Sequence, residues 1–518
     1  MRYITGRRAL VTLCLATIGS LRAQAPAYTN PVIPGDHPDP SVVRVGNEYW
    51  ATATTSQWAP IFHLLRSRDL VNWTLEGAVF EQPPAWSSGS YWAPEIAEHR
   101  GRFFVYYTAR RRNGPLCVAV ATATKPGGPW TDRGPLVCQD AGSIDAMAVT
   151  DASGRRYLIW KEDGNSRKLP TPLWAQQLTD NGTALTGTPT EILRNEAEWE
   201  GHLIEGPFIL RRNGWFYLFY SAGACCGRKC DYRLGVARAR AILGPWERSS
   251  ANPLLQANEN WKCPGHGSLV TRPDGRTFLL YHAYHPQDFE YAGRQALLDE
   301  VTWKDEWPVI NGGRGPSAQP SASSVAKRDG RPTIVDAFDS SRLDPQWQWP
   351  WDRTPKRSIA GGVLRLQAAG RDPANPADTI VARPALTRNY TVTVRLARPS
   401  GPATFAGLSI YGDAGNAIGL SLSGTRAILW RREKGSQKTV ATVDAPAVQV
   451  VDLRVTATDG SRFQFAMSAD GETWQSIGEN TQAGDLPPWD LAVRIALAVG
   501  GPAGSEGQFE WIRIQQGS

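Results

Sequence analysis

The chain has 518 residues, of which 41% are hydrophobic and 20% are charged, and its formal net charge is +7. These fractions are those of an ordinary globular protein, and the length favours two or more domains. The positive charges are scattered and no basic run exceeds three residues, so the sequence does not indicate a nucleic-acid partner.

The first 25 residues predict a secretory signal peptide. Three arginines (Arg2, Arg7 and Arg8) precede an apolar run that ends at Ile18, and small residues follow at Ala23 and Ala25. The run is too short to span a bilayer, and no later stretch is long and apolar enough for a membrane helix. The sequence therefore predicts a secreted or periplasmic protein with no membrane partner. Without the segment's four arginines the mature chain would be near +3.

Six cysteines remain after this segment, and an even number in an exported protein predicts disulfides. They are Cys117, Cys138, Cys225, Cys226, Cys230 and Cys263. A metal knot around the cluster at 225–230 is the alternative, which we favour less because the cluster contains no histidine. Cys263 is a candidate partner for one member of the cluster, and the connectivity stays open.

The stretch from Gly35 to Ser41 places an acidic residue between two prolines, as Pro38-Asp39-Pro40. Proline fixes its own φ and favours extended geometry in the residue before it. We therefore expect Asp39 to stand in an extended segment at the start of a strand, where it could serve as a catalytic base or a ligand. The alternative is an ordinary aspartate in a proline-rich turn.

A short pattern then recurs five times, in which a glycine precedes a run of aromatic and long apolar residues. The glycines are Gly46, Gly101, Gly154, Gly214 and Gly275, which lie 55, 53, 60 and 61 residues apart. Each copy is typical of a turn that leads into an apolar strand. A period of this length without a convincing amphipathic helix predicts an all-β fold, a five-bladed β-propeller over residues 28–312. A large β-sandwich is the competing interpretation.

Residues 313–332 are rich in Gly, Ser, Pro and Ala and predict a linker. Residues 333–518 contain about nine short alternating segments, which predict a β-sandwich of the jelly-roll kind. This domain could bind carbohydrate or cap the propeller. Its tryptophans Trp347, Trp349 and Trp351 could stack on sugar rings or pack against the propeller, and we favour packing.

Three acids stand at related places in the repeated half: Asp39 before the first strand, Asp145 before the third repeat glycine and Glu205 before the fourth. In a propeller the innermost strands face one axis, so these residues could meet in one pocket. Hydrolysis of a glycosidic bond needs one carboxylic acid and one carboxylate, and a third acid nearby can raise the pKa of the acid by repulsion.

Together, the segments around these acids resemble glycoside hydrolase family 43, in the family's order and over roughly residues 30–310. The segments are Pro38-Asp39-Pro40-Ser41, Tyr91-Trp92-Ala93-Pro94-Glu95, Ser143-Ile144-Asp145, Glu205-Gly206-Pro207 and Gly265-His266-Gly267-Ser268. The second half resembles the concanavalin-like domain that follows the propeller in β-xylosidase-like members of the family.

The resemblance implies a five-bladed propeller and an inverting mechanism, in which Asp39 is the general base, Glu205 the general acid and Asp145 the acid that tunes the pKa of Glu205. We therefore expect Glu205 to be protonated more readily than a free glutamate. His266 matches a histidine near the axis that helps to hold a cation or a water molecule. We predict that the cation is calcium. This sequence departs from the family at Ala146, where proline is common, and in its loop at 225–230.

Three residues are expected to contact the substrate: Trp92, Arg294 and His266 itself. Arg294 matches an arginine that contacts substrate in xylosidase-like members, and Trp92 is expected to line the pocket. We predict an exported glycoside hydrolase that removes xylosyl or arabinofuranosyl units from plant cell-wall polysaccharides or oligosaccharides. The alternatives are an endo-acting arabinanase and a non-catalytic carbohydrate-binding protein with the same fold.

Overall fold

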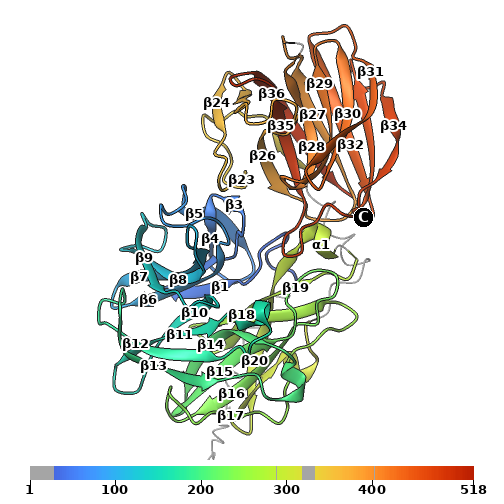
Figure 1. Ribbon diagram of the computed structural model, residues 1–518. Coiled ribbons are helices and arrows are strands. Elements are labelled where there is room, and N and C mark those ends of the chain that lie inside the picture. The colour runs from blue at the N-terminus through green and yellow to red at the C-terminus, as the bar shows by residue number, and fades with distance from the viewer. Residues whose placement is uncertain (1–27, 288, 318–332, 402, 518) are drawn as a thin grey trace, which may run out of the picture.

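The computed structural model describes residues 28–287, 289–317, 333–401 and 403–517 (Figure 1). Nearly all of the regular secondary structure in the described residues is β-strand, which confirms the all-β prediction. Its helices are one short α-helix and three 3-10 turns: α1 (Phe289–Ala292), η1 (Gly164–Arg167), η2 (Glu198–Glu200) and η3 (Asn311–Gly313). None of the described helices could cross a membrane. The predicted signal peptide and most of the predicted linker lie outside the described residues.

The first half forms five antiparallel sheets of four strands each. The first contains β1 (Ser41–Val45), β2 (Glu48–Thr52), β4 (Ile61–Ser67) and β5 (Trp73–Phe80). The second contains β6 (Trp92–His99), β7 (Arg102–Arg110), β8 (Leu116–Ala123) and β9 (Thr131–Val137). The third contains β10 (Ser143–Thr150), β11 (Arg156–Glu162), β12 (Leu173–Leu178) and β13 (Leu185–Leu193). The fourth contains β14 (Ile204–Arg212), β15 (Trp215–Ala222), β16 (Arg233–Ala239) and β17 (Glu247–Arg248). The fifth contains β18 (Lys262–Thr271), β19 (Thr277–Tyr284), β20 (Arg294–Lys304) and β21 (Trp307–Ile310).

The five sheets correspond to the five sequence repeats. Each repeat glycine lies in the turn between the first and second strand of one sheet and has positive φ, from 61° at Gly46 to 89° at Gly154. A residue with a Cβ is strained there, which explains why glycine opens each repeat. The first strands also contact one another in a closed ring, β1 with β6, β6 with β10, β10 with β14, β14 with β18 and β18 with β1. This ring brings residues far apart in sequence to one axis.

The second half consists of two larger antiparallel sheets and confirms the sandwich domain (Figure 1). One sheet contains β22 (Ile334–Asp336), β24 (Lys356–Ala360), β25 (Val363–Gln367), β27 (Tyr390–Ala397), β32 (Val450–Thr458), β33 (Arg462–Ser468), β34 (Gln475–Gln482) and β36 (Glu506–Gln516). The other contains β26 (Thr379–Pro384), β28 (Phe405–Asp413), β29 (Asn416–Ser423), β30 (Arg426–Glu433), β31 (Ser436–Asp444) and β35 (Arg494–Gly500). A continuous apolar core fills the space between the sheets.

The two halves are joined by a short pair of strands and a buried ion pair. Strand β23 (Trp349–Pro350) pairs with β3 (Trp58–Ala59) of the first half. An Arg494 Nη2 atom lies 3.0 Å from Asp36 Oδ2, with both side chains 2% exposed. Each of these buried charges would be left uncompensated without the other, so the ion pair stabilises the contact between the two halves.

The three tryptophans of residues 347–351 are packed rather than presented to solvent, as we favoured. Trp349 is 3% exposed in a core cluster of the first half, and Trp351 packs edge-on against Tyr91 at 6.2 Å. Trp347 instead belongs to the core of the sandwich, where its indole N–H donates to Asp336. Only two of the three therefore contact the first half.

Candidate active site

The axis carries one residue with left-handed backbone geometry from each sheet. These residues are Asp39 (φ 51°), Ala93 (φ 42°), Asp145 (φ 56°), Gly206 (φ 58°) and His266 (φ 44°). The extended geometry expected for Asp39 is therefore wrong. The local preference imposed by Pro40 is overridden by the tertiary structure, and a short aspartate side chain tolerates the left-handed region better than most residues do.

A polar side chain from the neighbouring sheet fixes four of these five residues through their backbone N–H groups. Thr54 Oγ1 accepts from Ala93 at 2.7 Å, and Thr108 Oγ1 accepts from Asp145 at 3.1 Å. Ser221 Oγ accepts from His266 at 2.8 Å, and His282 Nδ1 accepts from Asp39 at 3.0 Å. All four acceptors follow the second strand of a sheet or stand near its end, so the same contact is repeated around the axis.

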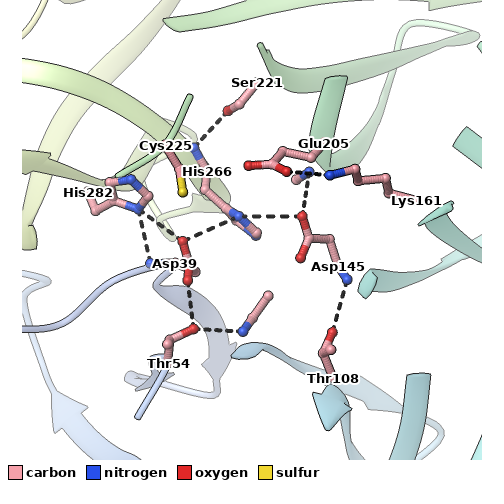
Figure 2. A network of polar contacts seen from close by, with 12 residues as sticks. Asp39, Thr54, Thr108, Asp145, Lys161, Glu205, Ser221, Cys225, His266 and His282 are labelled. Carbon is pink, nitrogen blue, oxygen red and sulfur yellow. Dashed lines mark hydrogen bonds and ion pairs between the residues drawn. The ribbon is translucent and has the colours of Figure 1, made fainter. Parts of the chain in front are cut away.

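Lys161 occupies the corresponding place in the third sheet and breaks the pattern, because an ammonium group cannot accept a hydrogen bond. The N–H of Gly206 donates instead to Asp145 Oδ2 at 3.0 Å. The Lys161 Nζ atom, on a side chain that is 1% exposed, lies 2.7 Å from Glu205 Oε2 and 3.1 Å from Asp163 Oδ1. With Lys161 in this place, the Asp145 carboxylate binds the backbone N–H of Gly206, and the Glu205 carboxylate pairs with the Lys161 ammonium group (Figure 2).

Asp39 is held by donors on both carboxylate oxygens. Thr54 donates to Oδ2 at 2.6 Å, and Arg294 Nη1 donates to Oδ1 at 3.0 Å. Burial alone would raise the pKa of Asp39, but the charge of Arg294, followed by a smaller contribution from His266, outweighs it and holds the pKa well below its usual range. Burial lowers the pKa of His282 to about 4, so this histidine is neutral and its Nδ1 can accept from the Asp39 backbone. Asp39 is thus an ionised carboxylate, as a general base requires.

The other two acids have the opposite order of acidity to the one that we expected. Burial raises the pKa of Asp145 to about 7, and repulsion from Glu205 adds to this effect. Burial acts in the same direction on Glu205, but the attraction of Lys161 prevails and lowers the pKa of Glu205. The expectation that Glu205 is protonated more readily than a free glutamate is therefore wrong for this ligand-free site, because it took no account of the Lys161 charge beside Glu205.

The remaining predicted residues lie beside these acids. His266 Nδ1 is 3.5 Å from Asp39 Oδ1 and 3.9 Å from Asp145 Oδ2, so the ring stands between the two carboxylates (Figure 2). Arg294 is 4% exposed and contacts Asp39 directly. The indole N–H of Trp92 donates to Ser56 Oγ at 2.9 Å.

All six predicted site residues line one cavity of about 870 Å³. They are Asp39, Trp92, Asp145, Glu205, His266 and Arg294. The volume suits a short oligosaccharide. The acids therefore lie on one face of the molecule and open into one space.

The sandwich domain also contributes to this cavity, through Trp489 and Asp490. Asp490 Oδ2 accepts from Ser56 Oγ at 2.8 Å, and Ser56 in turn holds Trp92. Trp489 is 63% exposed, the most exposed large hydrophobic side chain among the described residues. The cavity is therefore built by both halves of the chain.

Sequence reasoning missed four residues of the site: Lys161, His282, Trp489 and Asp490. The first two directly follow the aromatic residue that ends a repeat, as Trp160-Lys161 and Tyr281-His282. Comparison of the repeats at that position could have found them. The other two stand in a loop of a separate domain, and no local pattern marks them.

The expected metal site has few direct ligands. Among the described residues, no group of three or more His, Cys, Asp or Glu side chains is arranged to hold a metal ion. His266 is the predicted ligand, and a lone imidazole is a poor partner for a hard cation such as calcium. The side chains alone therefore do not form a calcium site.

Residues 28–308 match Glycosyl hydrolases family 43, which is more than half of the chain. This chain belongs to that family. Residues 335–488 match the Beta xylosidase C-terminal Concanavalin A-like domain. The family 43 chain is 30% identical to a xylosidase/arabinosidase from Humicola insolens over 313 residues, a match that spans 56% of each chain.

Two other family 43 proteins match over most of their length. A non-reducing end α-L-arabinofuranosidase from Bacteroides ovatus is 27% identical, over 85% of each chain. The crystal structure of a family 43 protein from Bacillus licheniformis is 25% identical and has a TM-score of 0.81, over 95% of this chain and 100% of that one. The protein is therefore a glycoside hydrolase of the xylosidase and arabinofuranosidase type.

Proposed function

We propose that this family 43 hydrolase is an exported, inverting enzyme that removes xylosyl or arabinofuranosyl units from plant cell-wall polysaccharides or oligosaccharides. The observation that carries the proposal is the convergence of Asp39, Asp145 and Glu205 in one cavity, with Asp39 held ionised by Arg294. Such a set of acids suits general acid and base catalysis, and binding alone does not require it.

The proposed architecture is a five-bladed β-propeller followed by the sandwich domain. Five four-stranded sheets whose first strands contact one another in a closed ring support it. Each sheet would be one blade, with its first strand on the axis.

In the proposed mechanism Asp39 removes a proton from the attacking water, and Glu205 protonates the oxygen of the leaving group. Thr54 and Arg294 fix the Asp39 carboxylate and keep it ionised. Asp145 keeps the proton of the acid pair in the ligand-free site, and its repulsion favours a proton on Glu205 whenever Asp145 is ionised. The attack and the departure take place in one step, so the configuration of the sugar carbon is inverted.

Three features support the finer points of the proposal. The loop with Trp489 and Asp490 reaches the cavity beside Arg294, and a cavity bounded by a second domain favours removal of terminal units over cleavage within a chain. The arginine-rich, apolar N-terminal segment favours export. All six cysteines of the predicted mature chain are paired, as 117–138, 225–226 and 230–263, which suits an oxidising compartment.

The experiment is an assay of the mature protein on aryl β-xylosides, aryl α-L-arabinofuranosides, xylo-oligosaccharides and arabino-oligosaccharides. We expect release of single pentoses. Glu205→Gln should slow natural substrates by about 10²-fold or more and activated aryl glycosides far less, because the latter need little protonation. Asp39→Asn should slow both alike. No release from any substrate would overturn the proposal, and oligomers released from debranched arabinan would instead indicate an endo-acting arabinanase.

We also propose that calcium binds near His266. Water molecules and other oxygens would have to supply nearly all of its ligands, because a lone imidazole is a poor ligand for a hard cation. Removal of calcium should lower activity or the unfolding temperature. Full activity and stability in excess chelator, confirmed metal-free by elemental analysis, would contradict it.

A further inference from the structure

A disulfide between adjacent residues, Cys225 and Cys226, lines the cavity that contains the acids. Both cysteines are half-buried. Figure 2 shows the sulfur of Cys225 on the side of the site where Asp39, His266 and His282 lie. The disulfide is therefore part of the surface that a bound substrate meets.

The loop that carries this disulfide is fixed at several points. A second disulfide joins Cys230 to Cys263, which stands in β18, the strand that also carries His266. The backbone N–H of Ala224 donates to Asp231 Oδ1 at 2.7 Å. Arg228 Nε lies 2.6 Å from Glu290 Oε1. The position of the sulfur pair relative to His266 is thus set by covalent and polar contacts, and a rigid surface loses little entropy when it binds a ligand.

The chemistry of the disulfide contrasts with that of its surroundings. Besides aliphatic residues such as Ile144 and Leu203, many of the side chains that line the cavity are charged, among them Asp39, Asp145, Lys161, Glu205 and Arg294. These groups can bind the hydroxyls of a sugar, but they offer nothing to the C–H groups of its ring. A disulfide is apolar and polarisable, and it carries no strong donor or acceptor that would hold water in place.

The two tryptophans of the cavity are less suited to that contact. The indole of Trp92 is oriented by its bond to Ser56 and through it by Asp490 of the sandwich domain. Trp489 is largely exposed to solvent, so it would meet the outer part of a longer substrate. The Cys225 sulfur lies on the side of the site where Asp39 stands (Figure 2), and in the proposed mechanism the sugar unit to be removed lies beside that base.

We propose that the Cys225–Cys226 disulfide is the apolar surface on which the C–H groups of the removed pentosyl ring pack. The inference rests on the proposed function, since it names the group that recognises the ring of that substrate. If the disulfide has this role, the loop at 225–230, which departs from the family pattern, determines substrate affinity.

The first test compares the kinetics of two double variants with those of the wild type. Cys225→Ala with Cys226→Ala should raise KM by about 5- to 20-fold and change kcat by less than about 3-fold. Cys117→Ala with Cys138→Ala removes a disulfide that does not line the cavity and should lower the unfolding temperature without changing KM. An unchanged KM in a folded 225/226 variant would overturn the inference.

The second test needs no variant and no turnover. The wild type is treated with a phosphine reductant and an alkylating agent, with or without xylose, arabinose, xylobiose or arabinobiose, and modification is mapped by mass spectrometry. At least one sugar should slow alkylation of Cys225 and Cys226 by 5-fold or more and leave Cys117 and Cys138 unaffected. Equal rates with every sugar would overturn the inference. If the wild type shows this protection but hydrolyses none of the substrates, the proposed function is wrong and the contact between the disulfide and the sugar is retained.

Discussion

Lys161 determines which of the two neighbouring acids carries the proton. Its ammonium group lies 2.7 Å from Glu205 and lowers the pKa of that carboxyl, so only a small fraction of Glu205 is protonated at neutral pH. Since the pKa of Asp39 lies well below its usual range, Asp39 stays ionised in mildly acidic solution. The site is therefore expected to work best on the acidic side of neutrality.

Replacement of Lys161 by methionine tests this account through the pH profile. Loss of the positive charge raises the pKa of Glu205, so the acid stays protonated to higher pH and the alkaline limb of kcat/KM moves to higher pH. We expect a displacement of about one pH unit or more, together with a lower maximal rate because Glu205 loses its partner. An alkaline limb that stays in place or moves to lower pH would contradict the role given to Lys161.

Asp145 should reduce the stability of the protein at neutral and alkaline pH. Burial raises its pKa from 3.8 to about 7 on folding, so protonation favours the folded state. Stability is therefore lost as the pH rises from about 4 to about 7, because the unfolded chain ionises first. Asp145→Asn keeps an acceptor for Gly206 and removes this loss.

We expect Asp145→Asn to unfold with a free energy about 2–4 kcal/mol higher than the wild type at pH 8, with a difference that shrinks towards zero at pH 4. The same variant should lose most of its activity. Denaturant unfolding at the two pH values checks this expectation. A gain that is equal at both pH values, or larger at pH 4, would show that the charge of Asp145 is not the cause.

A hydrogen bond that recurs between neighbouring sheets positions the acids. In each case a polar side chain near the end of a sheet's second strand accepts from a backbone N–H of the next sheet. Thr108 is fully buried and accepts from the N–H of Asp145 at 3.1 Å. Thr108→Val keeps the shape of the side chain and leaves that N–H without a partner, which costs about 1–3 kcal/mol. We expect this loss of stability together with a kcat lowered by about 10-fold and a nearly unchanged KM.

Thr108→Ser is the matched control, since it keeps the hydroxyl. It should retain kcat within about 2-fold, and its stability should fall mainly by the lost methyl group. Equal kinetics for the valine and serine variants would mean that the hydrogen bond does not position Asp145.

Much of the strand arrangement could be predicted from the sequence, because in each sheet of the first half a glycine turn leads into a buried apolar second strand. In the sandwich, about nine segments were predicted and each overlaps a strand, but the described residues form fourteen strands in the two sheets, so β22, β24, β26, β31 and β34 were missed. Strand β31 runs along a sheet edge with mostly exposed residues, and β34 is largely exposed too. Strands of this kind lack the alternation of apolar and polar residues on which the prediction depends.

The site was predictable where it lies in marked segments. Asp39 and Glu205 stand beside a proline or a glycine, Asp145 follows Gly142 by three residues, and all three reach the same cavity. Their order of acidity was not predictable, because it depends on a Lys161 contact between residues 44 positions apart. The contribution of Asp490 to the site was not predictable either, because Asp490 contacts Ser56, which lies 434 positions away in the sequence.

The whole molecule depends on the junction between its two halves. Asp36 binds Arg494 at 3.0 Å and also accepts from the backbone N–H of Ala492 at 3.2 Å. The loop that it holds includes Asp490, whose backbone oxygen accepts from Arg294 at 3.5 Å. Docking of the sandwich domain is therefore linked to the site.

Asp36→Asn leaves the buried Arg494 charge without a carboxylate. We expect a loss of about 3–5 kcal/mol in the stability of the junction, seen in calorimetry as two separated transitions, and a reduced kcat/KM. Arg426→Ala is the control, since its partner Asp444 is 85% exposed and such pairs contribute at most about 1 kcal/mol. An Asp36→Asn variant that unfolds in one transition at the wild-type temperature would show that the ion pair does not secure the junction.

The central claim, one-step hydrolysis by Asp39 and Glu205, is tested most directly by proton NMR of the sugar released at early times. The substrate is whichever aryl pentoside the wild type hydrolyses fastest. The account predicts that the anomer opposite to the substrate's appears first, α-xylose from a β-xyloside or β-arabinofuranose from an α-L-arabinofuranoside, and that mutarotation follows. First appearance of the anomer that matches the substrate would indicate a covalent intermediate and contradict the account.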